Sequence, residues 1–257
     1  MTEFAVPTNL FKARLAAREA PVLGLWLMLG ADASTELLSD AGFDYVLIDG
    51  EHSPLDIDLI RRQIAAAERG ASSVVARPPV NEAWVLKQML DAGAQSFIIP
   101  MVDTAAQAEA AVAASLYPPQ GARAVAGVVR AARYGRIPGY VTKANAEICV
   151  VPQVETMTAV ENIEAICAVP GVDAIFIGPS DLSASMGFTG RPGAPEVDEV
   201  IRSSIARIHA CGKPACTLGF DEASVAKYLE MGADMVAVGS DVTLLLRGAA
   251  ELLGKYR

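Results

Sequence analysis

The sequence contains eight short apolar runs that alternate with longer segments of helical period. The runs are continuously apolar, a pattern typical of parallel strands that are covered on both faces. Eight strands alternating with helices in 257 residues predict an α/β fold of the (β/α)8 barrel (TIM barrel) type. The strands are expected at 22–29, 44–49, 73–77, 96–101, 148–154, 173–178, 214–218 and 235–239.

A single barrel domain covering 1–257 is expected, because barrels of this length are commonly one domain. The long gap at 117–147 is predicted to be an insertion between the fourth and fifth strands, serving the active face or a subunit contact. A doubly wound open sheet is the alternative, although no G-x-G-x-x-G motif follows the first strand. Helices are expected at 56–69, 82–91, 104–116, 156–168, 197–211 and 221–231, with Asp32, Thr104, Thr156 and Asp221 as N-caps.

The composition narrows the class of partner. The chain is 52% hydrophobic with a net charge of −9, which argues for a folded core and against nucleic acid or an anionic membrane surface as a partner. The longest apolar stretch is too short to span a bilayer, and no signal-peptide pattern begins the sequence. The four cysteines form no C-x-x-C pair and are expected to be free thiols, in keeping with a cytoplasmic protein.

Polar residues follow several of the predicted strands directly. The clearest case is the run 45–52, where apolar residues give way to Asp49, Glu51 and His52. Such groups cannot lie inside a buried strand without partners, so they belong where the strand opens into a loop. In a barrel these strand ends meet at one site. The other strands contribute Arg77, Gln153, Glu155, Ser180, Asp181 and Asp241 at their ends.

Glu155 and Asp181 follow successive strands and are predicted to share one divalent cation. Ligation by oxygen alone favours Mg²⁺ or Mn²⁺, and two protein ligands leave room for an α-keto acid to chelate the ion. The alternative, about as common for any single acid, is a helix cap or a surface ion pair. Free N–H groups of Ser180 and Asp181 at a helix start would hold a carboxylate.

Arg77 and His52 are the candidate cation and the candidate base. Arg77 is placed to hold an anion or a developing enolate oxygen, and its alternative is a solvated arginine before the Pro-Pro loop. His52 could act as a general base near neutral pH, or could be a loop histidine bonded to nearby backbone. His209 lies among charged residues in a predicted helix and is expected at the surface.

As an ordered set, the strand ends resemble the metal-dependent (class II) pyruvate aldolases of the HpcH/HpaI family. The likeness runs from about residue 10 to the C-terminus. The matching segments are 24–27, 43–52, 75–78, 87–93, 117–119, 153–155 and 176–183. One departure is Ala124, where the family often has the last glycine of a G-x-R-G segment, and this departure puts the local loop geometry and the acceptor shape in doubt.

The resemblance implies a carbon–carbon lyase that reversibly cleaves 4-hydroxy-2-oxo acids through a metal-stabilised enolate. The products would be pyruvate, or a hydroxypyruvate-like analogue, and an aldehyde, in the catabolism of aromatic or sugar acids. Mg²⁺ or Mn²⁺ would be the cofactor, with Co²⁺ as a further candidate. The resemblance also implies that the C-terminal helix is exchanged between subunits, in dimers that assemble into a homo-hexamer.

The resemblance assigns a role to each matching position. Glu155 and Asp181 would bind the metal, and the N–H groups of Ser180 and Asp181 would hold the carboxylate of pyruvate. Arg77 would stabilise the enolate oxygen. The remaining positions are His52 for proton transfer, Asp91 (from the same or a neighbouring subunit) to orient it, Gln153 against the substrate, and Asp49 and Trp26 on the aldehyde side.

Other classes of protein stay open as alternatives. A Schiff-base aldolase needs a lysine on a barrel strand, and none of the six lysines lies in a predicted strand. A phosphate-binding isomerase would use the ends of the last two strands, but Asp241 would face the phosphate. A related acyl-CoA lyase and a non-catalytic keto-acid-binding protein remain. Phe220 is hypothesised to narrow the acceptor pocket, but the sequence does not name the aldehyde, the preferred metal or the stereochemistry at C4.

Overall fold

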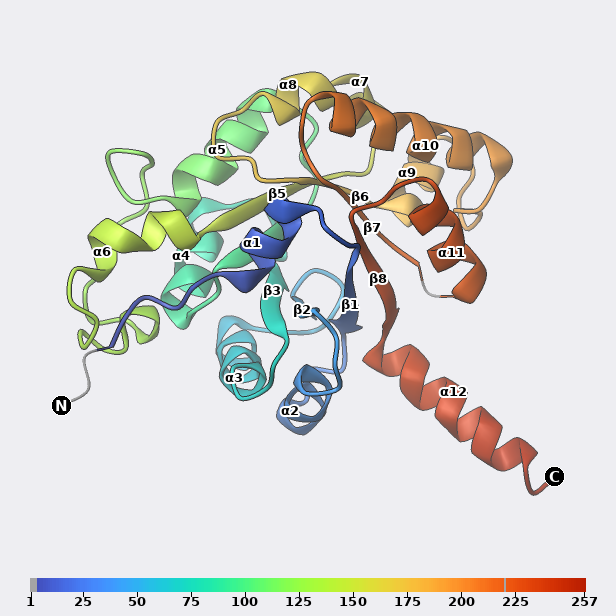
Figure 1. Ribbon diagram of the computed structural model, residues 1–257, viewed down its shortest axis with the longest axis horizontal. Helices are drawn as coiled ribbons and strands as arrows, with labels where there is room; N and C mark the ends of the chain where they lie inside the picture. The colour runs from blue at the N-terminus through green and yellow to red at the C-terminus, as the bar shows by residue number, and fades with distance from the viewer. Residues whose placement is uncertain (1–3, 220) are drawn as a thin grey trace.

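The computed structural model describes residues 4–219 and 221–257 and shows a closed barrel of parallel strands (Figure 1). The strands pair in sequence order, and the last pairs with the first, so the open-sheet alternative is wrong and the (β/α)8 barrel is confirmed. Several strands are shorter than predicted at one or both ends. Their bounds are β1 Val22–Leu27, β2 Tyr45–Asp49, β3 Ser73–Arg77, β4 Ser96–Ile99, β5 Cys149–Val154, β6 Ile175–Ile177, β7 Ala215–Leu218 and β8 Met235–Ser240.

The helices surround the barrel and mostly begin at the predicted caps. Thr104, Thr156 and Asp221 each accept a hydrogen bond from a backbone N–H in the first turn of the helix that follows. Asp32 is instead the first residue of its helix, and Ala31 occupies the cap position. The helices are α1 Leu10–Ala17, α2 Asp32–Ser39, α3 Ile57–Ala67, α4 Ala83–Ala92, α5 Ala105–Ser115, α6 Tyr140–Lys143, α7 Met157–Glu161, α8 Ile163–Cys167, α9 Pro179–Ser185, α10 Pro195–Ala210, α11 Glu222–Glu230 and α12 Asp241–Gly254.

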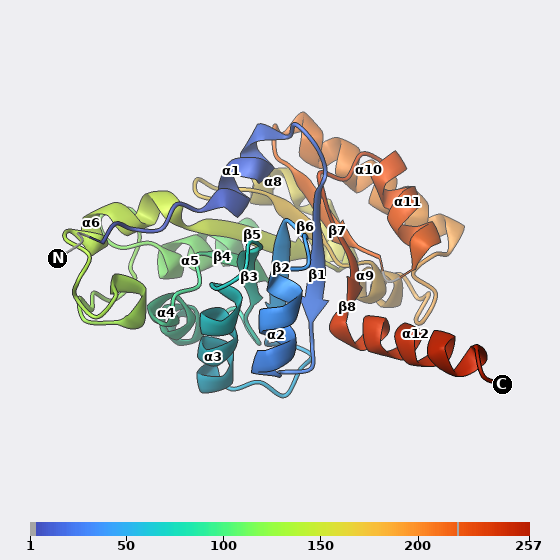
Figure 2. The ribbon, with the colours of Figure 1, turned by 60° about the horizontal axis from the view of Figure 1, so that its bottom comes forward.

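Apolar side chains form two layers, one inside the barrel and one between the strands and the helices. Helix α1 closes the end of the barrel at which the strands begin, and Figure 2 shows it opposite the end from which α12 leaves. Phe11 and Leu15 of α1 are buried there, and the Phe11 ring lies edge-on to Tyr45 at 5.3 Å between centroids. The barrel is therefore open at its other end, where the strands finish, and we call this end the mouth.

The segment between α5 and β5 forms a small subdomain of its own. It contains α6 and two 3₁₀ turns, Arg130–Ala132 and Ala144–Glu147. Its core is separate from the barrel cores, and the N-terminal segment packs against it (Figure 1). That core consists of Tyr117, Ala132, Ile137, Tyr140 and Ala144.

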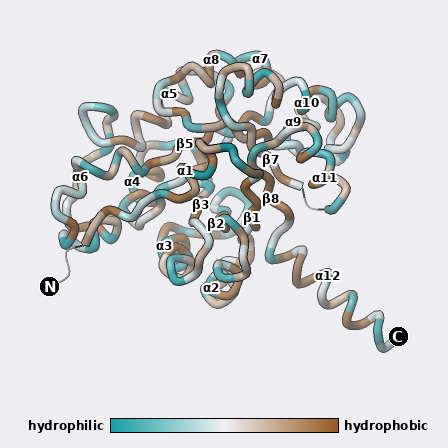
Figure 3. Tube along the Cα trace, in the orientation of Figure 1, coloured by the Kyte–Doolittle hydropathy of each residue, from teal (hydrophilic) through white to brown (hydrophobic). Residues whose placement is uncertain are grey.

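Helix α12 extends away from the barrel instead of covering it (Figures 1 and 2). Leu245 and Leu252 are 63% and 59% exposed, and apolar residues recur along the helix in Figure 3. A terminal helix with this much exposed apolar surface suits a protein contact. In the part of the chain that the structure describes, no helix is long and apolar enough to cross a membrane.

Candidate active site

Strands β2 and β3 bring an arginine and two carboxylates together at the open mouth of the barrel. Asp49 and Arg77 are register partners at the last position of each strand. The guanidinium donates two hydrogen bonds to Asp49, at 2.8 and 2.7 Å. Its third nitrogen lies 2.8 Å from Glu51 Oε2. Arg77 is therefore fixed on two sides, since a guanidinium presents its donors in a rigid fork.

Trp26 forms the floor beneath this ion pair. The centre of the Arg77 guanidinium lies 4.9 Å from the centroid of the Trp26 ring, and both Trp26 and Asp49 are buried. Burial alone would raise the pKa of Asp49, but the hydrogen bonds and the charge of Arg77 outweigh it and lower the pKa. The charged form of Asp49 is therefore favoured, and both of its oxygens bond Arg77.

Glu155 lies at the end of β5 with both carboxylate oxygens engaged. Its Oε1 accepts the backbone N–H of Met101 at 2.7 Å, and its Oε2 accepts the Gln153 side-chain amide. Gly178, which precedes α9, packs directly on this pair. A Cβ at Gly178 would lie 3.0 Å from Glu155 Oε2 and 3.4 Å from Gln153 Nε2. The absence of a side chain at Gly178 is what lets β6 and α9 approach Glu155.

Three carboxylates influence one another at this mouth. Burial raises the pKa of Glu155 to about 7, and the carboxylates of Glu51 and Asp181 add to the rise. Burial also raises the pKa of Glu51, with Arg77 and His52 opposing and Asp181 adding to it. Asp181 itself is exposed in the first turn of α9, the turn whose N–H groups have no acceptor within the helix.

This donor set fits a divalent cation. A buried carboxylate with a pKa near 7 is one whose charge is not compensated by the chain, and a cation would compensate it. Gln153 Oε1 is buried and has no hydrogen-bond partner among the described residues. No group of three His, Cys, Asp or Glu side chains able to hold a metal is found in residues 4–219 and 221–257. Glu155 and Asp181 influence each other electrostatically, and a cation held by these two carboxylates would need further ligands from solvent or substrate.

His52 and Asp91 are not together within one chain. The His52 side chain is 56% exposed, and its Nε2 lies 3.9 Å from Glu51 Oε2. Asp91 is in the last turn of α4, where its carboxylate accepts a 2.6 Å bond from the buried guanidinium of Arg123. A helix that starts after β3 returns its last turn toward the closed end of the barrel. An Asp91–His52 contact therefore requires a second chain.

Two further polar residues make structural contacts. Asp241 accepts the backbone N–H groups of Met28 and Leu29 at 2.9 and 3.0 Å, so it ties the loop after β1 to the start of α12. His209, expected at the surface, has a side chain that is 28% exposed, and its Nε2 lies 2.8 Å from Asp234. All six lysines are described, and none lies in a strand, which agrees with the argument against a Schiff base.

Sequence reasoning missed two contributors to the site. Glu51 stood out in the polar cluster after β2 but received no role, because nothing in the sequence shows that it contacts Arg77. Met101 contributes only its backbone N–H, from a left-handed conformation with φ of 55°. No sequence pattern signals such a donor. Phe220, the hypothesised wall of the acceptor pocket, lies outside the described residues.

The comparisons with known proteins agree with this architecture. The profile of the HpcH/HpaI aldolase/citrate lyase family matches residues 22–248. The chain is 47% identical over 249 residues to 4-hydroxy-2-oxo-heptane-1,7-dioate aldolase of Salmonella heidelberg, covering 96% of this chain and 94% of that one. It is 45% identical to hydroxypyruvate/pyruvate aldolase of Pseudomonas aeruginosa, covering 98% and 94%.

A solved structure gives the same answer. The chain superposes on an HpcH/HpaI aldolase/citrate lyase family protein from Burkholderia cenocepacia J2315 with a TM-score of 0.95 and 38% identity, covering 97% of this chain and 100% of that one. Fold and site together define an α/β-barrel enzyme. The chain belongs to the HpcH/HpaI aldolase/citrate lyase family. It is a class II aldolase and thus a lyase.

Proposed function

We propose that this enzyme reversibly cleaves 4-hydroxy-2-oxo acids to pyruvate, or a hydroxypyruvate-like keto acid, and an aldehyde. The observation that carries the proposal is the set of interacting carboxylates at the barrel mouth, beside a fixed arginine. The similarity to relatives named for the aldolase reactions of a 4-hydroxy-2-oxo acid and of pyruvate supports the same substrate class.

Glu155 and Asp181 are the residues that would hold a divalent cation, Mg²⁺ or Mn²⁺, with Co²⁺ as a further candidate. Oxygen donors without nitrogen or sulfur favour these hard ions. When bound, the cation supplies a Lewis acid for the keto group of the substrate. Gln153 holds Glu155 through its amide nitrogen, and its Oε1 is buried without a hydrogen-bond partner among the described residues.

Arg77 stabilises the negative charge that develops on the substrate oxygen. Its two ion pairs fix the guanidinium before the reaction begins, so little reorganisation is needed as charge forms. The N–H groups of Ser180 and Asp181, in the exposed first turn of α9, receive the substrate carboxylate.

His52 moves the proton, and its exposed ring is reachable both from solvent and from a neighbouring chain. Asp91 of a second subunit would orient this ring, because Asp91 of the same chain is held by Arg123. Trp26 and Asp49 shape the aldehyde side from below Arg77. We place the enzyme in the cytoplasm as a homo-hexamer built from three dimers, joined through exchange of α12.

Hydrogen exchange of pyruvate tests this function without knowing the aldehyde. Proton NMR in D₂O with EDTA-treated protein is expected to show a stable methyl signal, which disappears once Mg²⁺ or Mn²⁺ is restored. Glu155→Ala and Asp181→Ala are each expected to abolish this exchange while circular dichroism shows an intact fold.

The matched control is Asp241→Asn, which changes a strand-end carboxylate that bonds only backbone N–H groups among the described contacts. It is expected to keep metal-dependent exchange even where it lowers stability. Folded wild-type protein that exchanges no pyruvate protons with any of the metals would refute pyruvate as the nucleophile.

A further inference from the structure

A cavity lies at the opposite end of the barrel from the candidate active site. Its volume is about 630 Å³. The turn between α3 and β3, the N-terminal segment and the subdomain between α5 and β5 form its walls. Because the strands begin at this end, no substrate at the open mouth reaches it, and the aldolase reaction leaves it unexplained.

The residues that line this cavity carry a net positive charge, whereas the whole chain is negatively charged. Four arginines line it, Arg69, Arg130, Arg133 and Arg136, against the single carboxylate of Glu68. The whole chain, by contrast, carries a net charge of −9. A local excess of positive charge in an acidic protein needs a physical reason, because like charges that gather at one site repel one another.

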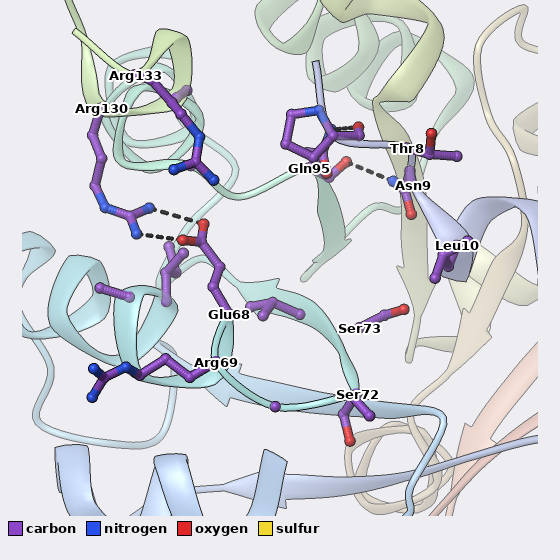
Figure 4. A pocket seen from close by; sticks show the side chains of 18 of the residues that line it. Thr8, Asn9, Leu10, Glu68, Arg69, Ser72, Ser73, Gln95, Arg130 and Arg133 are labelled. Carbon is purple, nitrogen blue, oxygen red and sulfur yellow. Dashed lines mark hydrogen bonds and ion pairs between the residues drawn. The ribbon is translucent and has the colours of Figure 1, made fainter. Parts of the chain in front are cut away.

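Part of this charge is already compensated. Arg130 donates two hydrogen bonds to Glu68, at 3.0 and 2.6 Å (Figure 4). It donates a third, at 2.8 Å, to the backbone carbonyl of Ala92. Arg69 lies 3.2 Å from Glu36. Arg133 and Arg136 form no ion pair with a carboxylate in residues 4–219 and 221–257. Among the described residues, their charge is the part of the lining that no carboxylate offsets.

These two guanidinium groups share one aromatic neighbour. Each lies 5.2 Å from the centroid of the Phe4 ring. Arg136 Nε also donates a 2.9 Å hydrogen bond to the backbone carbonyl of Arg133. Arg133 and Tyr134 both have a left-handed backbone, with φ of 47° and 56°, which non-glycine residues adopt at some cost. Both arginines are therefore anchored by local contacts in one segment of the cavity wall.

Other parts of the wall contain polar groups beside apolar ones. Gly93 faces the Arg130 guanidinium, and a Cβ there would lie 2.5 Å from its Nη1, so the guanidinium occupies the space of the missing side chain. Figure 4 shows Thr8 and Ser73 across the cavity from the arginines. Hydroxyl donors opposite guanidinium forks are suited to an oxyanion with several acceptor atoms.

We propose that this cavity is a binding site for a small oxyanion of two or more negative charges, a dicarboxylate or a phosphate, held by Arg133 and Arg136. Guanidinium groups bind carboxylate and phosphate oxygens bidentately, which matches both classes. The volume is in the usual range for small-molecule sites. Arg130 lies beside the bound anion as a third, partly neutralised cation.

Calorimetric titration of metal-free protein with succinate and, separately, with inorganic phosphate tests this site. The buffer has low ionic strength and contains no other oxyanion, because exposed charges are screened by salt. Saturable binding of either anion is expected. The double variant Arg133→Gln/Arg136→Gln is expected to bind at least about tenfold more weakly, since it removes both positive charges and their charge-assisted hydrogen bonds to the anion.

Two controls locate the binding. Arg62→Gln/Arg202→Gln removes two exposed arginines that do not line the cavity, and it is expected to bind as the wild type does. Arg77→Gln removes the cation of the open mouth and is also expected to retain binding. Thermal melting establishes that each variant is folded, and Arg136→Gln alone replaces the double variant if that variant is unstable.

Three results would overturn the proposal. These are no saturable binding of either anion to wild-type protein, unchanged affinity in the folded Arg133→Gln/Arg136→Gln variant, or loss of all binding in folded Arg77→Gln. The last result would place the anion in the open mouth. None of these outcomes depends on aldolase turnover, so this site and the proposed reaction can fail independently.

Discussion

At the scale of single residues, the mouth of the barrel depends on how Arg77 is held. Asp49 and Glu51 occupy all three guanidinium nitrogens, and the Arg77 side chain is only 7% exposed. These contacts hold the Arg77 guanidinium in place, so its charge would need little reorganisation when a substrate binds. The same pairing makes Asp49 dependent on Arg77, because a buried carboxylate that loses its partner is strongly destabilising.

Arg77→Ala is expected to slow metal-dependent pyruvate exchange by at least about 10²-fold, the scale of losing one oxyanion donor. It should also lower the free energy of unfolding by about 3–5 kcal/mol, since Asp49 is left buried and unpaired. Exchange is followed by NMR, and stability by denaturant unfolding.

The control for Arg77→Ala is Arg207→Ala. This change breaks a bidentate pair with Glu164 that is 32% and 55% exposed, so its cost should stay below about 1 kcal/mol with exchange unaffected. A fully active, fully stable Arg77→Ala enzyme would contradict the role assigned to Arg77.

The raised pKa of Glu155 predicts that the stability of the folded protein falls as the pH rises toward neutrality. Its pKa is raised to about 7 in the folded protein, chiefly by burial, from an ordinary value of 4.5. The folded state therefore binds a proton that the unfolded state releases, and this contribution to stability is lost as the pH rises from about 4.5 to about 7. The expected loss in metal-free protein is of the order of 3 kcal/mol.

Comparing the wild type with Glu155→Gln isolates this contribution from other titrating groups. Urea unfolding at a series of pH values should show the decline in EDTA-treated wild type and a much flatter curve in the variant. Adding Mn²⁺ to the wild type should reduce the decline, because a bound cation favours the charged carboxylate. Parallel curves for the two proteins would show that Glu155 is not perturbed.

At the scale of elements, the approach of α9 to β5 sets the geometry of the two candidate ligands. Gly178 allows this approach, and its φ of −94° is ordinary, so its requirement is space and not backbone freedom. The turns after the strands thus decide where the strand-end acids point. The sequence predicted the strands and helices well, but it could not show how closely a turn packs on its neighbour.

Gly178→Ala is expected to displace the Glu155 carboxylate, since the new Cβ would lie 3.0 Å from Oε2 and 3.1 Å from the Glu155 Cβ. Manganese affinity should fall at least about tenfold, the lower end of the effect of disturbing groups that orient a ligand. Isothermal titration with Mn²⁺ measures it.

Gly248→Ala in α12 is the matched control. No atom lies within 4 Å of its added Cβ, and a helical alanine is favoured over glycine by about 0.5–1 kcal/mol. It should leave manganese affinity unchanged. Equal affinity in Gly178→Ala and the wild type would show that the contact does not position Glu155.

Element boundaries illustrate the limit of periodicity. The predicted helix at 156–168 is two short helices, α7 and α8, that meet at Asn162. The Asn162 side chain donates to the backbone carbonyl of Asp103 at 2.9 Å, a contact with a distant loop. The apolar period is unbroken through this point, so only the tertiary contact marks the change of direction.

At the scale of the whole molecule, α12 is the helix that extends away from the barrel instead of packing on it. Its leucines face solvent in the single chain, and its first residue is anchored through Asp241. Exposed apolar surface of this extent is costly unless another protein surface covers it. The exchange of α12 between subunits stays a prediction that the single chain does not test.

Leu245→Gln/Leu252→Gln is expected to reduce the mass measured by light scattering from that of a hexamer, while the barrel stays folded. These side chains are 63% and 59% exposed, so the change removes intermolecular packing and little intramolecular packing. Leu37→Gln is the control, because Leu37 is 74% exposed on α2. Unchanged mass in the α12 variant would remove this helix from the assembly.

The barrel, and most of the groups at its mouth, could be predicted from the sequence alone. Continuous apolar runs alternating with helical periods admit few parallel folds, and strand ends in a closed barrel converge whatever the side chains are. Arg77, Glu155 and Gln153 could therefore be assigned to one region from their positions alone.

The pairing of these groups depends on contacts between residues that are far apart in the sequence. Met101 binds Glu155 from 54 residues away, Arg130 meets Glu68 from 62 residues away, and Asp91 turns to Arg123 within its own chain. Such contacts depend on packing between elements that are distant in sequence, and the hydrophobic periodicity of the sequence does not predict them. The fold was therefore readable from local pattern, whereas the perturbed Glu155, the fixed Arg77 and the basic cavity became visible only in the assembled barrel.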